Sequence, residues 1–112
     1  MKTPEGLLKD KIKSFLKAKG AYYHMPVPVG YGIPSLDIIG CYRGLFFSIE
    51  TKAPGHRPTP RQEMCMREIH KAGGEAMWTD SFEHFTSWWE AVLDVSDISE
   101  ADENWFKNAK LK

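Results

Sequence analysis

Four charged side chains stand in an otherwise largely apolar part of the sequence, residues 34–52 (PSLDIIGCYRGLFFSIETK). Asp37 lies near the start of this stretch, Glu50 and Lys52 lie at its end, and Arg43 marks its centre. Burying an unpaired charge is unfavourable, so these groups must compensate one another or bind something. Two carboxylates and one ammonium group are the residue types from which a metal-assisted hydrolytic site can be built.

The spacing of these residues predicts that they meet on one face of a hairpin. Only residues 43–44 (Arg-Gly) separate two strand-like runs, which is typical of a two-residue turn. Such a turn fixes the register, and counting outward from it places Asp37 directly opposite Glu50. Cross-strand partners share a face, with Cβ atoms about 5 Å apart. Lys52 is two residues beyond Glu50 and therefore shares that face as well.

This constellation indicates phosphodiester chemistry. Two adjacent carboxylates repel each other unless a proton or a cation lies between them. An all-oxygen site of this kind suits Mg²⁺ or Mn²⁺. A neighbouring lysine can orient a water molecule and offset negative charge that develops on a phosphate. The alternative is a simple ion pair between Lys52 and one of the acids on a solvated sheet face.

The elements that must position these groups follow from periodicity and capping signals. Thr3 and Pro4 begin a helix that Gly20 ends, and the sequence Thr59-Pro60-Arg61-Gln62 begins another with a capping box. A helix between two strands requires a crossover, which predicts a parallel strand pair. The expected α/β order is α-β-β-β-α-β-α, with helices at 3–19, about 59–72 and from 80 or 81 onward, and strands at 21–29, 36–42, 45–52 and 75–79.

Length and composition are consistent with one domain. The 112 residues contain no apolar run of the length that crosses a membrane and no secretory signal, so we expect a cytoplasmic protein. Cys41 and Cys65 form no paired motif and are expected as reduced core thiols. Net charge is zero, but residues 94–112 carry five acidic residues against three lysines. We therefore expect a domain at 1–93 and an acidic tail, with a short helix, at 94–112.

The motifs together resemble the VRR-NUC family, the virus-type replication-repair nucleases of the PD-(D/E)xK superfamily, in a small stand-alone, phage-like form. Asp37 followed by Glu50-Thr51-Lys52 matches the PD-(D/E)xK pattern, although Ser35 and Leu36 separate Pro34 from the aspartate. The resemblance covers about residues 3–85 and implies a restriction-endonuclease-like α-β-β-β-α-β core. The other features that carry it are Glu5, Gly32-Ile33-Pro34, Gly44, Ile49-Glu50-Thr51-Lys52-Ala53, Pro60-Arg61-Gln62 and Gly73-Gly74.

The resemblance implies a role for each site residue. Asp37 and Glu50 would bind the divalent metal, with the Thr51 carbonyl as an extra ligand, and Lys52 would be the catalytic lysine. Glu5 would complete the metal shell, directly or through water. The alternative for Glu5 is an acid that favours the first turn of a helix.

Residues just beyond Lys52 are expected to take part as well. Gln62 matches the helix glutamine of the family, and the alternative is that it only completes the capping box with Thr59. His56, Arg57 and Arg61 are candidates for contacts to phosphates.

The resemblance also implies an activity and a partner. We expect a Mg²⁺- or Mn²⁺-dependent endonuclease that acts on DNA, and on branched DNA such as a Holliday junction if it resembles the small members of the family. A homodimer would suit the two equivalent strands of such a junction. The alternatives are a nuclease for linear DNA and a non-catalytic nucleic-acid-binding module on the same fold.

Overall fold

The computed structural model describes residues 2–27 and 35–94 of the chain. These residues form an α/β domain with the helices and strands in the predicted order. In this part of the chain the elements are α1 (Pro4–Lys19), β1 (Tyr22–His24), β2 (Ile38–Tyr42), β3 (Leu45–Thr51), α2 (Pro60–Lys71), β4 (Glu75–Thr79), α3 (Phe82–Trp88) and the π-helical turn η1 (Trp89–Leu93).

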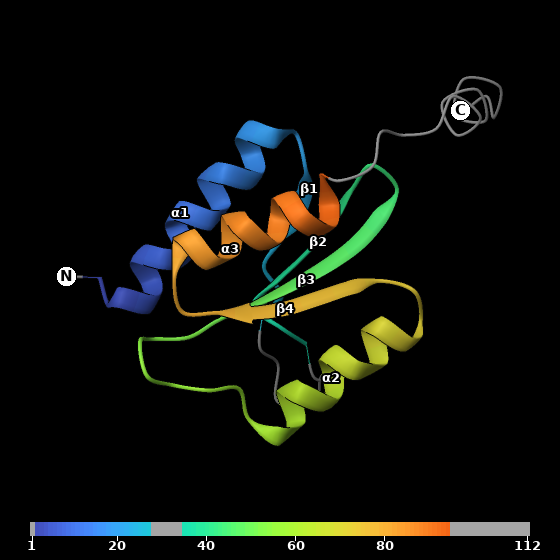
Figure 1. The fold of residues 1–112 in the computed structure, drawn as a ribbon. Coiled ribbons are helices and arrows are strands. Elements are labelled where there is room, and N and C mark those ends of the chain that lie inside the picture. Colours follow the sequence, from blue (N-terminus) through green and yellow to red (C-terminus); the bar gives the residue numbers. More distant parts are fainter. Residues whose placement is uncertain (1, 28–34, 95–112) are drawn as a thin grey trace, which may run out of the picture.

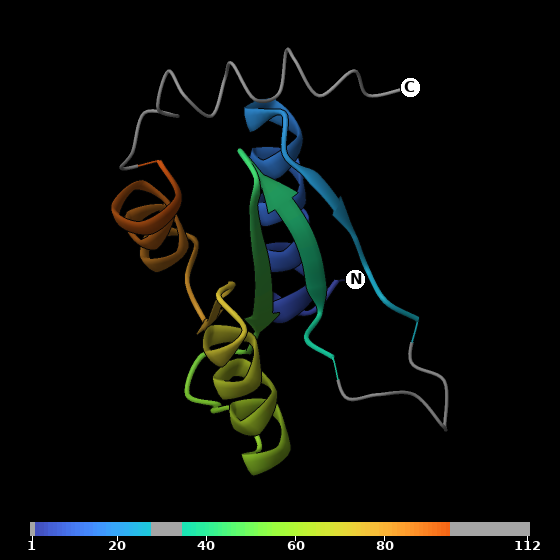
Figure 2. The same cartoon turned by 90° about the vertical axis from the view of Figure 1, so that its right-hand side faces the viewer.

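The four strands form one mixed sheet in the order β1-β2-β3-β4. β1 and β3 pair with β2 in antiparallel fashion, whereas β3 and β4 are parallel, as the crossover through α2 requires. Helices α1 and α3 cover one face of the sheet and α2 covers the other (Figure 1). β1 lies at the outer edge of the sheet (Figure 2). The predicted α/β fold with the element order α-β-β-β-α-β-α is confirmed.

Local sequence signals account for the bounds of α1 and α2. The Thr3 hydroxyl accepts the N–H of Gly6 at 3.0 Å, and Gly20 ends α1 with a left-handed φ of 75°. Thr59 and Gln62 form the predicted capping box at the start of α2. Both helices therefore begin at prolines that follow a threonine cap.

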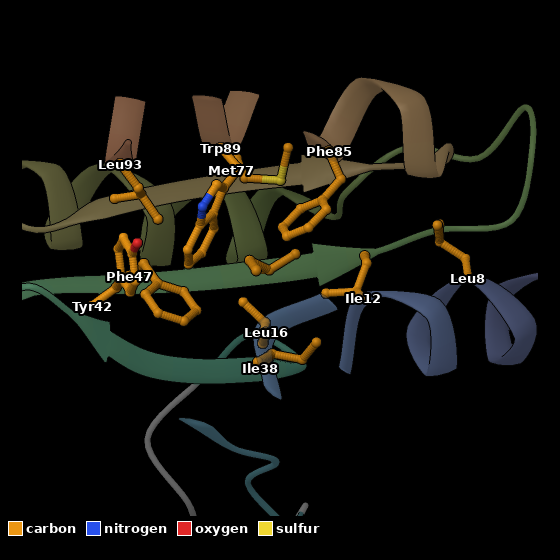
Figure 3. Close-up of a cluster of buried hydrophobic side chains, with 11 residues drawn as sticks. Leu8, Ile12, Leu16, Ile38, Tyr42, Phe47, Met77, Phe85, Trp89 and Leu93 are labelled. Carbon is orange, nitrogen blue, oxygen red and sulfur yellow. The ribbon is translucent and has the colours of Figure 1, made fainter. Parts of the chain in front are cut away.

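The main core lies between the sheet and the helices α1 and α3. Figure 3 shows side chains from α1, α3 and η1 pointing toward the strands, and Phe47 and Trp89 are fully buried among them. The Phe15 ring meets the Trp89 ring edge-on, at 5.5 Å between centroids. The buried members of this core are Leu8, Ile12, Leu16, Ile38, Tyr42, Phe47, Ile49, Met77, Phe85, Trp89 and Leu93.

Close packing within the sheet requires a glycine at position 40. A Cβ atom built on Gly40 would lie 2.3 Å from the Tyr22 carbonyl oxygen and 2.5 Å from the Phe47 ring. The Phe47 ring therefore lies over the bare backbone of its cross-strand partner. This contact holds β1 against β2 and brings the Phe47 ring into the core.

Several sequence-based bounds differ from the structure. The first strand was expected at 21–29 but spans only Tyr22–His24, and the second and third strands each lose terminal residues. Asp37 and Lys52 therefore lie just outside the strands, where solvent reaches them. The last helix continues as η1, whose wider turn places Leu93 in the core. Cys41 is exposed on β2 and is not the core thiol that was expected.

The predicted acidic tail lies outside the described residues except for its first member. The Asp94 carboxylate accepts a hydrogen bond from the Tyr42 hydroxyl at 3.0 Å and pairs with Lys19 at 3.1 Å. Asp94 thus ties the end of η1 to the hairpin and to the end of α1. The Gly32-Ile33-Pro34 loop also falls outside the described part. None of the helices described there has the length and apolar character needed to cross a membrane.

Candidate active site

The hairpin has the predicted register. Its turn is formed by residues 43–44, which have positive φ values of 52° and 81°, as a type I′ turn requires. Strand pairing extends from this turn to the pair of Ile38 with Ile49. One step further, the Asp37 N–H donates to Glu50 Oε1 at 3.2 Å. The predicted juxtaposition of Asp37 and Glu50 is confirmed.

Asp37 is oriented by the residue that follows Glu50. Its Oδ2 atom accepts the Thr51 N–H at 3.0 Å and the Thr51 hydroxyl at 2.8 Å. Thr51 is fully buried, so both donors are fixed in the protein interior. The Oδ1 atom makes neither bond and faces the ammonium group of Lys9 at 3.6 Å. The two Thr51 bonds therefore fix the direction of Asp37 Oδ1, whose partner is the Lys9 ammonium group.

Glu50 is the most buried acid of the site, with a relative exposure of 4%. Its Oε2 atom accepts the Gln62 side-chain N–H at 3.1 Å and lies 3.4 Å from Lys52 Nζ. Burial raises the pKa of Glu50 to about 7, the Asp37 carboxylate adds to the rise, and Lys52 opposes it. A buried carboxyl group that is costly to ionise is expected to gain from a bound cation.

Glu5 reaches the same place from the first turn of α1. One carboxylate oxygen from each of Glu5, Asp37 and Glu50 lies within 4.8 Å of the other two. Figure 1 shows why residues so far apart in sequence can meet, since the N-terminal part of α1 and the C-terminal ends of β3 and β4 lie at one end of the molecule. Three carboxylates with one deeply buried member are a donor set that fits Mg²⁺ or Mn²⁺.

Gln62 serves two purposes at the start of α2. Its Oε1 atom accepts the Thr59 N–H at 2.9 Å, which completes the capping box. Its Nε2 atom donates to Glu50 Oε2. The two alternatives considered for Gln62 are thus compatible, because the amide has one acceptor for the cap and one donor for the carboxylate.

The basic residues beyond Lys52 are placed differently. His56 and Arg57 lie in the loop between β3 and α2, and Arg61 lies in the first turn of α2. All three are exposed, and their side chains make no ion pair with the site acids within residues 2–27 and 35–94. They follow Lys52 in the chain and are exposed to solvent, and their role in DNA contact stays a prediction.

The contacts that two residues make at this site were not expected from the sequence. Lys9 was not among the expected site residues, yet its ammonium group pairs with Asp37. Lys9 shares a helix face with Glu5 because residues four apart lie one turn from each other, but the packing of α1 against the sheet decides whether that face meets Asp37. The N–H and the hydroxyl of Thr51 hold Asp37, which was not expected, and ligation of a metal by the Thr51 carbonyl stays a prediction. No sequence signal distinguishes these uses of a threonine.

Comparison with known proteins identifies the fold. No family model matches the chain, and no curated protein matches it. A solved structure titled "VRR_NUC domain" superposes with a TM-score of 0.71 at 20% sequence identity. The match covers 81% of this chain and 99% of that chain. The chain therefore has the fold of a VRR_NUC domain, which confirms at the level of the fold the resemblance inferred from its motifs.

Proposed function

We propose that the protein is a divalent-metal-dependent endonuclease that hydrolyses phosphodiester bonds of DNA. The observation that carries the proposal is the convergence of Glu5, Asp37 and Glu50 within 4.8 Å, with Lys52 3.4 Å from Glu50. A site of this composition at one end of a VRR_NUC fold supports a nuclease over other hydrolases. Mg²⁺ and Mn²⁺ are the proposed cofactors, since every ligand offered is a hard oxygen.

The roles of the side chains follow from their contacts. Glu5, Asp37 and Glu50 would hold the metal, which supplies Lewis-acid activation of a phosphate and of water. Thr51 would keep the Oδ1 atom of Asp37 directed into the site. Lys52 would orient the attacking water and balance charge that develops on the phosphate, because its ammonium group is held beside Glu50.

Gln62 would act as a positioning residue in this scheme. Its side-chain N–H fixes one oxygen of Glu50, while its own carbonyl oxygen is fixed by the backbone of Thr59. The orientation of Glu50 is thereby linked to the start of α2. A Gln62→Ala variant would leave Glu50 in place but less well oriented, and we expect slower cleavage with little loss of DNA binding.

DNA is the proposed substrate, and branched DNA is the proposed preference. The exposed side chains of His56, Arg57 and Arg61 would contact phosphates next to the site. A small domain offers little surface for a four-way junction, and a two-fold dimer would present one site to each of two equivalent strands. The preference for branched DNA and the homodimer rest on the family resemblance.

The proposal is tested by cleavage of end-labelled DNA in Mg²⁺ or Mn²⁺, with a four-way junction, a flap, a linear duplex and a single strand compared. Lys52→Met is the site variant, and Lys11→Met, which removes an exposed lysine from α1, is the matched control. We expect paired nicks in the junction that the control retains and the site variant loses. Cleavage of every substrate would keep the nuclease and reject the junction preference. DNA binding without cleavage would favour a non-catalytic module.

A further inference from the structure

Lys9 is a second lysine at the carboxylate cluster. It lies one helical turn beyond Glu5 on α1, and its Nζ atom is 3.6 Å from Asp37 Oδ1. Both side chains are partly buried, at 27% and 24% exposure. Lys2 and Lys19, by contrast, pair with Asp10 and Asp94 away from the site.

The hydrogen bonds of Asp37 define what Lys9 does there. Oδ2 is already bonded to both donors of Thr51, so Oδ1 is the oxygen available to a cation. The Lys9 ammonium group lies beside that oxygen. A divalent cation bound by Asp37 would repel this ammonium, because the two positive charges would face the same carboxylate.

The charges of the cluster indicate where Lys9 would go. The three carboxylates, when ionised, and the two lysines carry one net negative charge. A bound divalent cation would reverse this to one net positive charge. A single phosphodiester group carries the negative charge that would neutralise it. If the Lys9 ammonium group leaves Asp37, it can therefore form a charge-assisted hydrogen bond with a phosphate of the bound DNA.

We propose that Lys9 exchanges partners as the site is loaded. It pairs with Asp37 in the metal-free protein, leaves that carboxylate when a divalent cation binds, and then contacts a phosphate of the bound DNA. This inference rests on the proposed nuclease function. It assigns two roles to Lys9. Before the metal binds, Lys9 occupies Asp37 and so competes with the metal for that carboxylate; after the metal binds, Lys9 contacts the DNA substrate.

The alternative is a structural ion pair that joins α1 to the start of β2. Such a pair would be retained when metal and DNA bind. Removing it would then change neither the affinity for the metal nor the metal dependence of DNA binding. Lys9→Met keeps most of the aliphatic stem and removes the charge, and Lys9→Gln provides a polar second variant. Lys11→Met is again the control for loss of one charge from α1, and Lys9→Arg tests whether charge alone is sufficient.

The first readout is Mn²⁺ binding by titration calorimetry without DNA. Removing a positive charge a few ångströms from the metal is expected to tighten Mn²⁺ binding about fivefold in Lys9→Met and Lys9→Gln, with no change in Lys11→Met. Unchanged affinity in both Lys9 variants would show that Lys9 does not compete with the metal. Absence of Mn²⁺ binding by the wild-type protein would reject the proposed function itself, and this role with it.

The second readout is the salt dependence of binding to a labelled four-way junction, measured by anisotropy with and without Mn²⁺. The Lys52→Met background, which lacks the proposed catalytic lysine, prevents cleavage. Each phosphate contact contributes about 0.9 to the slope of log affinity against log salt. We expect the added Lys9→Met change to reduce the slope by about that amount with Mn²⁺, and not in EDTA. If Lys9→Met changed the slope equally with Mn²⁺ and in EDTA, or in neither condition, the proposed exchange of partners would be wrong.

Discussion

The ionisation of Glu50 should couple the stability of the metal-free protein to pH. Burial raises the pKa of Glu50 in the folded protein to about 7, from an ordinary value of 4.5. Each tenfold change in proton affinity corresponds to about 1.4 kcal/mol, so this rise corresponds to about 3 kcal/mol. A group whose pKa is raised by folding adds stability at low pH. That contribution is complete below about pH 4.5 and is lost as pH rises through about 7.

The perturbation that isolates this effect is Glu50→Gln. The amide keeps the shape of the side chain, and its oxygen can still accept the Asp37 N–H or the Gln62 amide. The amide does not titrate. The stability of the variant therefore does not show the fall with rising pH that ionisation of Glu50 causes in the wild-type protein. Relative to Glu50→Gln, the wild-type protein should therefore become less stable by about 3 kcal/mol between about pH 4.5 and pH 8.

Urea unfolding in EDTA, followed by circular dichroism at intervals from pH 5 to pH 8, measures this difference. Titrating groups that do not interact with Glu50, the histidines among them, are common to both proteins and cancel in the comparison. A wild-type-to-variant difference that is independent of pH would refute the reasoning. It would mean that Glu50 ionises alike in the folded and unfolded chains, and so is not held in a desolvated site beside Asp37.

Four further outcomes are expected, each read from thermal or urea unfolding. Mg²⁺ should raise the melting temperature more at pH 8 than at pH 6, because the metal competes with the proton for the acids; a larger effect at pH 6 would contradict this. Gly40→Ala places a methyl group against the Phe47 ring and should cost about 2 kcal/mol, whereas a neutral effect would mean that the sheet relaxes freely. Tyr42→Phe removes the hydrogen bond to Asp94 and should cost about 1 kcal/mol. Thr59→Ala removes the cap of α2 and should also cost about 1 kcal/mol. Wild-type midpoints in either of these last two variants would argue against the corresponding contact.

The parts of the fold that sequence predicts are those that local rules determine. A two-residue turn at 43–44 leaves one register, so the meeting of Asp37 and Glu50 follows from counting. The threonine caps and the following prolines define where α1 and α2 begin, because each threonine hydroxyl accepts a first-turn N–H and each proline lacks the N–H that would be left unpaired there. The parallel pairing of β3 and β4 follows from the helix between them.

Contacts between distant elements could not be read in the same way. The pairing of Lys9 with Asp37 depends on how α1 packs against the sheet, which helical periodicity does not determine. The two bonds from Thr51 to Asp37 depend on where β2 begins, and that bound differed from the expected one. The short β1 reflects the same difficulty, since strand length is set by the partner strand as much as by local preference.

The most direct test of the central claim is cleavage of a labelled four-way junction and of its linear duplex by the wild-type protein and by Asp37→Asn. The asparagine keeps the contact geometry with Thr51 and removes the charge that a metal would bind. We expect cleavage by the wild-type protein in Mn²⁺, none in EDTA, and a loss of at least about 100-fold in Asp37→Asn, as for removal of a metal ligand or its partner. Equal cleavage by both proteins, or cleavage that persists in EDTA, would contradict a metal-dependent nuclease site at these carboxylates.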